Sequence, residues 1–450
     1  MRHRPDRLFL LMGGVQGLAF AWGLPAMVWW VVDLRLSPFR LAALGTALVL
    51  TILVTETPTG VVADLYSRKY SVVAAYAVMG TAMALGPVTE MFGALVIWQV
   101  LWGIGWTLQS GAATAWMTDE LAHHASHSHR SAALMLVESP TSGEDTEDED
   151  SDIARTDHNR QVDGLIVRHA IFRSVGVMVG LVAATVTGAW SVRGSMAAMG
   201  MLAIAAAGYL AVTMPEAGFE SPRRRAGGAP RPARTGAWND AITLWKRGAW
   251  LVRRDPSLLA VTLSAAIAAG AWEANDRLSA LRLFDLGLID LSSREAVLFF
   301  GAAWFVMSAL AIPMMTWLRR RLERSDADEQ SGQRDACLLA RFLTIAAVGA
   351  LALALSPWFA IALAGWAVLD VAGETAYSLT EAMANRHAEP AVRATVVSFV
   401  GQSQAVGEVA IGLGLGVVAQ LVSLPVALAA AGVFFAVSAA PVVLVARRSG

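Results

Sequence analysis

Cysteine and charge are both scarce in this sequence. Cys337 is its only cysteine, which excludes an internal disulfide bond and says nothing about the compartment. Charged residues make up 16% of the 450 residues, against about 25% in typical globular proteins. Hydrophobic residues make up 56%, so a soluble chain would have too little polar surface to cover itself. The net charge of −1 gives no reason to expect nucleic acid as a partner.

Signatures of enzymes and of nucleotide-binding proteins are also missing. The sequence contains no Walker or Rossmann glycine loop and no Gly-x-Ser-x-Gly, His-Glu-x-x-His or Cys-x-x-Cys pattern. An enzyme embedded in a membrane would need a nucleophile or a metal constellation, and neither is visible. We therefore expect a protein that is not an enzyme and that has no cofactor or resident metal.

What the sequence does contain is a series of apolar runs near 20 residues long, the length that a helix needs to cross a bilayer. They predict an all-α, multi-pass membrane protein with twelve transmembrane helices. The first run is too long for a cleaved signal peptide. The twelve segments are Leu8–Val32, Leu41–Ala63, Ser71–Glu90, Phe92–Met117, His169–Trp190, Ser195–Met214, Ser257–Leu278, Ala296–Leu318, Ala336–Leu355, Trp358–Ala384, Ala394–Leu421 and Pro425–Val445.

Lysine and arginine are distributed very unevenly between the two sides of these segments. The termini and alternate loops on one side carry 28 of the 35, the other side carries six, and Arg173 lies inside a segment. The positive-inside rule assigns the rich side to the cytoplasm. We therefore expect a protein of the cytoplasmic membrane with both termini inside.

Two long cytoplasmic loops divide the chain. Residues 118–168 form an insertion, and residues 215–256 form a linker between a six-helix lobe, 1–214, and a second one, 257–450. The linker begins with a basic, Pro- and Gly-rich stretch and then turns amphipathic near Trp245, which predicts a helix on the inner membrane surface. The insertion holds four histidines and an acidic tract, Glu138 to Asp157. This composition favours a disordered insertion over a weak metal site; the histidines are His123, His124, His127 and His129.

A loop motif identifies the superfamily that the chain resembles. Between the second and third segments stands Gly60-Val-Val-Ala-Asp64-Leu-Tyr-Ser-Arg68-Lys69-Tyr70. This segment resembles the G-x-x-x-D-x-x-(G/S)-R-(R/K) motif of the major facilitator superfamily. Further segments around Pro58, at Ala115 to Asp119 and from Arg393 to Gln402 resemble bacterial drug- or tetracycline-resistance-like exporters.

This resemblance implies two pseudo-symmetric six-helix lobes that expose a central cavity to each side in turn. It implies an inner gate in which Gly60 allows close helix approach, Asp64 caps a neighbouring helix, and Arg68 pairs with Asp119. We add Glu381 and Arg393 to this gate from their places at the cytoplasmic ends of segments ten and eleven. One departure is that segment five has no proline in its Arg173 to Gly180 stretch, which weakens the match to proton/drug antiporters.

Ionisable residues inside the membrane are costly, so they mark functional positions. Asp370, Glu374, Tyr377 and Glu381 are spaced four, three and four residues apart in segment ten and so share one helix face. Two carboxylates four residues apart repel when both are ionised, which favours a proton on one of them. Proton coupling requires a carboxyl group that can gain and lose a proton. The alternative is that these carboxylates are permanently paired with Arg173 or Arg277.

Other polar residues complete the predicted cavity. Glu56 and Glu408 are further candidates for proton coupling, and Glu273 could belong to an outer gate with Asp276 and Arg277. Trp366 lies one turn before Asp370. Gln16 and Gln109 could bind substrate or only bridge helices.

The sequence therefore predicts a monomeric secondary transporter whose partners are protons, the bilayer and a small molecule. Export of a small amphipathic compound is favoured. The alternatives are uptake, lipid or metabolite transport by the same fold, and a non-transporting membrane sensor or scaffold.

Overall fold

The structure is a computed structural model of the chain, and it describes residues 5–136, 147–219, 237–288, 290–324, 329–388 and 392–446. These residues contain helices and no strands, in agreement with the predicted all-α class. Among them are twelve helices, or continuous helical stretches, that are long and apolar enough to cross a membrane. The predicted number of spans is therefore confirmed.

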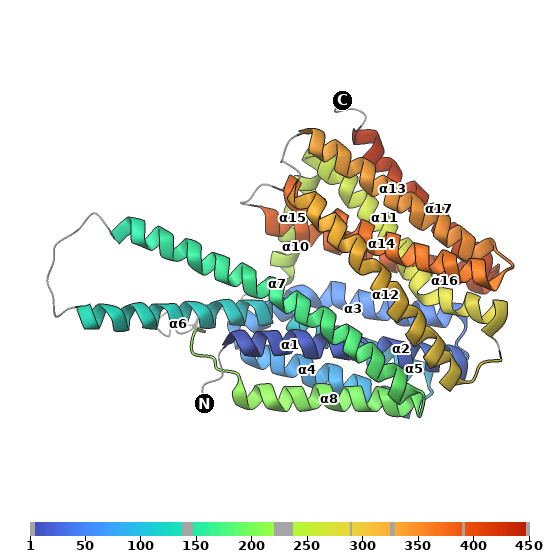
Figure 1. Cartoon of the computed structure of the whole chain (residues 1–450), viewed down its shortest axis with the longest axis horizontal. Helices are drawn as coiled ribbons and strands as arrows, with labels where there is room; N and C mark the ends of the chain where they lie inside the picture. Colours follow the sequence, from blue (N-terminus) through green and yellow to red (C-terminus); the bar gives the residue numbers. More distant parts are fainter. Residues whose placement is uncertain are drawn as a thin grey trace.

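Figure 1 shows the helices in two groups, which we call the N-lobe (α1–α8) and the C-lobe (α11–α17). The N-lobe contains α1 (Pro5–Phe20), α2 (Gly23–Val28), η1 (Trp29–Asp33), α3 (Pro38–Leu65), α4 (Arg68–Leu85), η2 (Gly86–Val88), α5 (Phe92–Gln109), α6 (Ala112–Leu136), α7 (Glu147–Gly188) and α8 (Val192–Thr213). The linker helix α10 (Ala237–Arg254) precedes the C-lobe. The C-lobe contains α11 (Pro256–Leu283), η3 (Phe284–Leu288), α12 (Ser293–Glu323), α13 (Glu329–Leu355), α14 (Phe359–His387), α15 (Arg393–Gly407), η4 (Glu408–Gly412), α16 (Leu413–Leu421) and α17 (Leu424–Ala446).

Local sequence explains where several of these helices begin. Ser67 and Ser191 accept hydrogen bonds from backbone N–H groups in the first turns of α4 and α8. Asp255 does the same for α11, where Pro256 occupies the first helical position. Ser292 and Glu295 form a capping box at the start of α12. These caps satisfy N–H groups that a helix leaves without partners inside itself.

Small residues allow the helices within each lobe to approach closely. Gly80 of α4 faces Gly200 of α8, and a Cβ at either position would lie within 3 Å of the other helix's backbone. Gly349 of α13 and Gly365 of α14 face each other in the same way. Because lipid is as apolar as the helix surfaces, this close packing replaces the hydrophobic driving force of a soluble core.

The two lobes meet near the ends of the helices that we call outer, opposite the N-terminus and the α6–α7 hairpin. There, Gly188 of α7 lies against Val297 of α12, and Gly416 of α16 lies against Ala42 of α3. Ser293 also donates a hydrogen bond of 2.5 Å to Asp33 across the lobes. The outer side of the interface is therefore closed in this structure.

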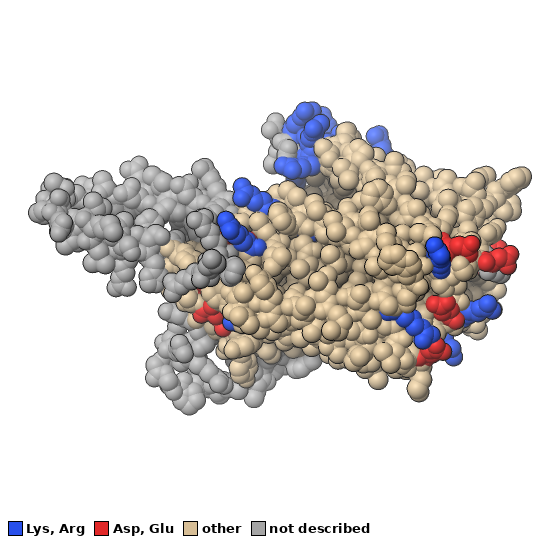
Figure 2. Space-filling view, turned by 60° about the horizontal axis from the view of Figure 1, so that its bottom comes forward, with Lys and Arg blue, Asp and Glu red and all other residues tan. Residues whose placement is uncertain are grey.

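Charged side chains are rare along the middle of the molecule. Figure 2 shows Lys, Arg, Asp and Glu gathered toward its two ends on this face, with an almost uncharged band between them. Large exposed apolar side chains such as Ile312, Val348 and Val433 belong to the spans in this region. This distribution is expected for a multi-pass protein whose middle faces lipid.

The insertion 118–168 differs from its predicted disorder in the described part. Helix α6 continues through Leu136, and α7 already begins at Glu147, so the two helices project well beyond the lobes (Figure 1). Extending an existing helix avoids the cost of nucleating a new one, which allows such polar segments to stay helical. The first half of the acidic tract, residues 138–146, and the side chains of His127 and His129 lie outside the described part of the chain.

The linker follows its prediction in part. Helix α10 occupies the predicted amphipathic segment, whereas the basic, Pro- and Gly-rich residues 220–236 before it lie outside the described part. Gly248 lies against Phe399 of α15, whose ring is also 5.4 Å from that of Trp245. Helix α10 also contacts α3, so it touches both lobes.

Candidate functional site

The polar stripe predicted on α14 lies within a membrane span and is open along most of its length. Asp370 is partly buried, whereas Glu374, Tyr377 and Glu381 are exposed. Tyr377 donates a hydrogen bond to Glu381, and Arg173 of α7 in the other lobe is among its electrostatic neighbours. Since an ionised carboxylate facing lipid is costly, this arrangement indicates that the stripe lines the space between the lobes.

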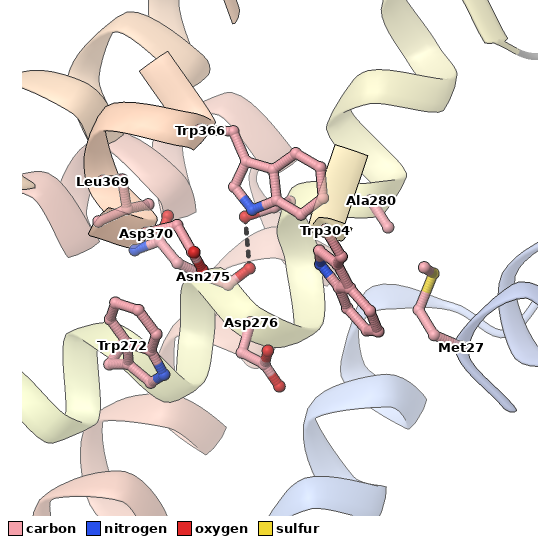
Figure 3. Close-up of a pocket in the computed structure, with 10 residues that line it drawn as sticks. Met27, Trp272, Asn275, Asp276, Ala280, Trp304, Trp366, Leu369 and Asp370 are labelled. Carbon is pink, nitrogen blue, oxygen red and sulfur yellow. Dashed lines mark hydrogen bonds between the residues drawn. The ribbon is translucent and has the colours of Figure 1, made fainter. Parts of the chain in front are cut away.

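A pocket lies at the outer part of this stripe. Its walls are formed mainly by α11, α12 and α14 of the C-lobe, and Met27 of α2 reaches it from the N-lobe. Figure 3 shows its lining residues, which are Met27, Trp272, Asn275, Asp276, Ser279, Ala280, Trp304, Trp366, Leu369 and Asp370.

An ion pair on α11 lies between this pocket and the N-lobe. Arg277 Nε donates to Glu273 Oε1 over 2.9 Å and is 3.8 Å from Oδ2 of Asp276. Glu408 of η4 is a further electrostatic neighbour of Arg277. Gly45 of α3 lies so close that a Cβ there would overlap the Glu273 carboxylate. The predicted outer-gate residues are thus together, and they touch both lobes.

The carboxylates of α14 have a different environment. Among the described residues, no ion pair joins Asp370 or Glu374 to a basic side chain. Asp370 instead has Glu374 and Asp276 as electrostatic neighbours. The alternative of permanent pairing with Arg173 or Arg277 is therefore not what this structure shows.

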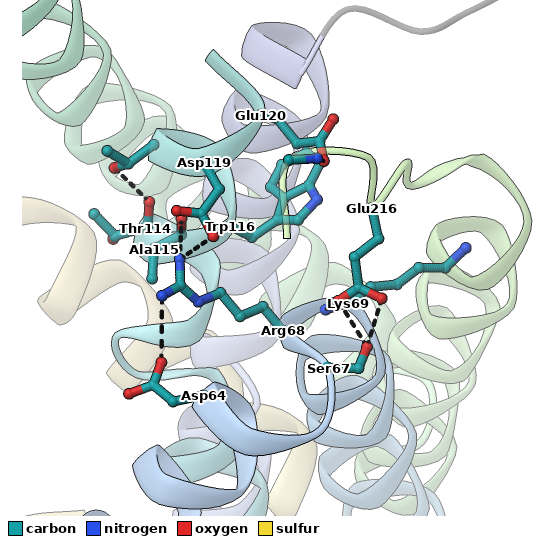
Figure 4. A network of polar contacts seen from close by, with 12 residues as sticks. Asp64, Ser67, Arg68, Lys69, Thr114, Ala115, Trp116, Asp119, Glu120 and Glu216 are labelled. Atoms are coloured by element: carbon teal, nitrogen blue, oxygen red, sulfur yellow. Dashed lines mark hydrogen bonds and ion pairs between the residues drawn. The ribbon is translucent and has the colours of Figure 1, made fainter. Parts of the chain in front are cut away.

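The inner-gate motif forms a compact cluster in the N-lobe (Figure 4). Arg68 makes an ion pair with Asp119, donates to the carbonyl oxygen of Ala115 over 2.8 Å, and is 3.4 Å from Asp64. The predicted pairing of Arg68 with Asp119 is thus present in the structure. Asp64 does not cap a neighbouring helix as predicted, because it interacts with Arg68 one turn further along and is largely exposed.

The carboxylate that caps α4 is Glu216, which the sequence analysis missed. Its two carboxylate oxygens share the single hydroxyl hydrogen of Ser67, at 2.7 and 2.8 Å from Oγ, and Oε1 also accepts from the backbone N–H of Lys69 at 3.0 Å. Nearby, Trp116 donates to the carbonyl oxygen of Pro215, and Glu120 accepts from the N–H of Gly218. The segment after α8 is therefore fastened to the inner gate (Figure 4).

The C-lobe has a counterpart of the Arg68–Asp119 pair with the charges reversed. Asp335, at the start of α13, accepts from Arg386, at the end of α14, over 3.0 Å. Arg386 also donates to the carbonyl oxygen of Leu322, as Arg68 does to that of Ala115. Both pairs join residues 51 positions apart. That repeated spacing of opposite charges is a sequence signal that could have found the second pair.

Three other predicted residues either take one of two expected roles or differ from the expected role. Gln109 was predicted either to bind substrate or to bridge helices, and it takes the second role, since it is buried and donates to the hydroxyl of Tyr76 over 3.1 Å. A Cβ at Gly60 would meet no atom within 4 Å, because the helices do not approach closely there in this structure. Arg393 is exposed, and Arg386 makes the ion pair of the C-lobe inner end instead.

The remaining candidates are close to their predicted surroundings. Trp366 lines the pocket, and Glu408 lies near Glu273 and Arg277. Glu56 is exposed in the inner half of α3, and Gln16 is partly buried in α1.

Solved structures share this fold, although no protein-family model and no curated protein matches the sequence. A crystal structure of the nucleoside transporter NupG matches with a TM-score of 0.65 over 99% of this chain and 98% of its own, at 12% identity. A bacterial homologue of the human lysosomal transporter Spinster, in an inward-facing and occupied conformation, matches with a TM-score of 0.67 over 100% and 98%, at 15% identity. The chain therefore shares the fold of these two transporters, with twelve helices long and apolar enough to cross a membrane.

Proposed function

We propose that this protein is a secondary active transporter that works by alternating access and exports a small amphipathic compound in exchange for protons. The observation that carries the proposal is a pocket at the interface of the two lobes, lined by the intramembrane carboxylates of Asp276 and Asp370, of which Asp370 has no ion-pair partner among the described residues. A sensor or scaffold would have no use for such costly groups in a pocket within the membrane spans.

The closed outer side supports alternating access. Lobe-to-lobe contacts gather around Gly45, Gly188 and Gly416, whereas Glu374 and Glu381, further towards the inner ends, are exposed. This is the arrangement of an inward-facing state. In the complementary state the outer contacts would open, and the Arg68 cluster would approach the C-lobe, as the superfamily resemblance implies.

Proton coupling is assigned to α14. An exporter driven by the proton gradient takes up protons from outside and releases them inside, in exchange for substrate. Glu374 is our first choice because it is accessible from the cavity and close to Asp370, whose charge favours a proton on one of the pair. Glu56 and Glu408 are the second choices.

The alternative of uptake keeps the same mechanism with the opposite coupling. The match to NupG, a nucleoside transporter, supports the further alternative of metabolite transport by the same fold, since its fold is as similar to this chain as that of the Spinster homologue. Direction has to be measured, by loading the substrate on one side of a vesicle at a time.

The test combines a screen with a transport assay. Compounds that raise the melting temperature of the purified protein are offered to proteoliposomes with and without a pH gradient. Gradient-dependent flux of any of them is the expected result. Glu374→Gln mimics the protonated state and should abolish that flux while substrate still binds; the exposed Asp290→Asn on the outer face serves as the control. Flux that survives in Glu374→Gln, Asp370→Asn and the double variant would remove α14 from the coupling mechanism.

The same proposal places both termini and the loops 118–168 and 215–256 in the cytoplasm. With Cys337 replaced by serine, a cysteine at Ser126 should resist an impermeant thiol reagent in intact cells, whereas one at Ser292 should react. Labelling at position 126 from outside would reverse this orientation.

A further inference from the structure

The pocket between the lobes has an unusual combination of aromatic and acidic walls. Three indole rings, from Trp272, Trp304 and Trp366, surround the carboxylates of Asp276 and Asp370 (Figure 3). No lysine or arginine is among the described residues that line it. Indole faces attract cations electrostatically, and they do so best where water is excluded.

The nearest basic group, Arg277, is shared among several carboxylates, and Asp276 is only one of them. Arg277 directs its Nε to Glu273 over 2.9 Å, and Glu408 is a further acidic neighbour. The acidic neighbours of Arg277 are thus Glu273, Asp276 and Glu408. Asp370 has no ion-pair partner among the described residues, and its electrostatic neighbours are the carboxyl groups of Glu374 and Asp276.

A third observation concerns Asn275, which lines the pocket and is only 3% exposed. Its Nδ2 donates to the carbonyl oxygen of Ala271 over 2.9 Å. The acceptor atom of the same side-chain amide is Oδ1. This oxygen has no hydrogen-bond partner among the described residues. A buried acceptor without a donor is costly, so it marks a place for a ligand that supplies positive charge or an N–H group.

We infer that the pocket binds lipophilic organic cations, with the charged centre near Asp276 and Asp370 and apolar groups against the three indole rings. This inference deepens the proposed transport function and rests on it for its biological meaning, but binding can be measured without transport. The inference states that the substrate is positively charged, which cannot be deduced from the fold.

The probe is tetraphenylphosphonium, whose charge does not depend on pH. Its binding to the purified full-length protein in detergent is measured by scintillation proximity, in competition with unlabelled tetraphenylphosphonium or with neutral triphenylphosphine oxide. We expect the cation to compete and the neutral compound to compete at least tenfold more weakly. Asp276→Asn or Asp370→Asn should weaken binding about tenfold or more, and Asp276→Glu should restore most of it.

The aromatic part of the inference has its own variants. Trp304→Leu or Trp366→Leu should weaken binding roughly 2- to 30-fold, the range expected for loss of one cation–π contact. The matched controls are Asp290→Asn and Trp358→Leu, which make the same chemical changes at exposed outer positions away from the pocket. Both should bind the probe like the unmodified protein.

Equal competition by the neutral compound, or unchanged affinity in both aspartate variants with their melting temperatures intact, would overturn the inference. So would the absence of any saturable binding. If the screen described above finds neutral or anionic compounds that are transported, the proposed function stands and this inference fails. If the cation binds in the pocket but no compound is moved, the inference stands and the transport function fails.

Discussion

Gly45 offers the sharpest test of how the lobes close on the outer side. It lies on α3, against the Glu273–Arg277 pair of α11, and a Cβ at this position would overlap Glu273 Oε1 and lie 2.5 Å from Arg277 Nε. Cβ atoms in proteins essentially never approach other heavy atoms closer than 3.0 Å. In Gly45→Ala, therefore, the ion pair must move or α3 must separate from α11.

The size of the effect follows from the cost of overpacking. Forcing an extra methyl group into a filled contact typically costs about 1–3 kcal/mol. If this strain exists only while the outer side is closed, the equilibrium moves towards the outward-open state by roughly 5- to 150-fold, since about 1.4 kcal/mol corresponds to a factor of ten.

Val297→Cys provides the reporter, in a chain whose Cys337 is replaced by serine. Val297 is completely buried and lies against Gly188 of α7, so it becomes reactive only when the outer contact opens. We expect Gly45→Ala to raise the labelling rate by an impermeant thiol reagent by the factor given above. Gly208→Ala is the matched control, in α8 of the same lobe, because its Cβ would meet no atom within 4 Å.

An unchanged labelling rate in a stably folded Gly45→Ala protein would refute the reasoning, because the α3–α11 contact would then not control closure. A lower melting temperature without faster labelling would mean that both states carry the strain. Labelling that rises equally in Gly208→Ala would point to a general loosening of the N-lobe.

Three further predictions concern the inner face. Arg68→Ala and Asp119→Asn should each impair transport in folded protein, and the double variant should lose little more than either single one, because the two side chains form one pair; additive losses in a proteoliposome assay would argue for separate roles. Asp335→Asn and Arg386→Gln should show the same non-additivity in the C-lobe, with a melting temperature reduced by each single change because Asp335 is buried; independent effects would contradict the proposed symmetry. Deletion of residues 139–159 should leave expression and transport nearly unchanged, because the part of α7 that it removes projects well beyond the lobes; a large loss would reveal a regulatory or metal-binding role, to be tested by zinc titration.

Much of the fold could be read from the sequence because the bilayer imposes simple rules on it. A run of about 20 apolar residues has to be a helix in lipid, so twelve runs predicted twelve spans. The spacing of Asp370, Glu374 and Tyr377 depends only on the 3.6-residue turn, so their common face was predictable too. Arg68 and Asp119 could be paired because both lie at the inner ends of their spans.

The sequence could not show which helix each of these faces meets. Glu216 caps α4 although it lies 149 residues from Ser67 along the chain, and Gly45 meets Glu273 across the lobe interface. Gln109 bridges helices instead of lining the cavity, because Tyr76 happens to stand opposite.

The sequence by itself thus determined the class of protein, the number of spans and the faces that carry polar groups, since all three depend on local periodicity and on the cost of polar groups in lipid. Only the tertiary structure decided that Trp272, Trp304 and Trp366 surround two carboxylates, and that the outer side is closed. The physical reason is that helix packing is set by long-range side-chain fit between segments, and each such fit depends on atoms from two distant parts of the chain.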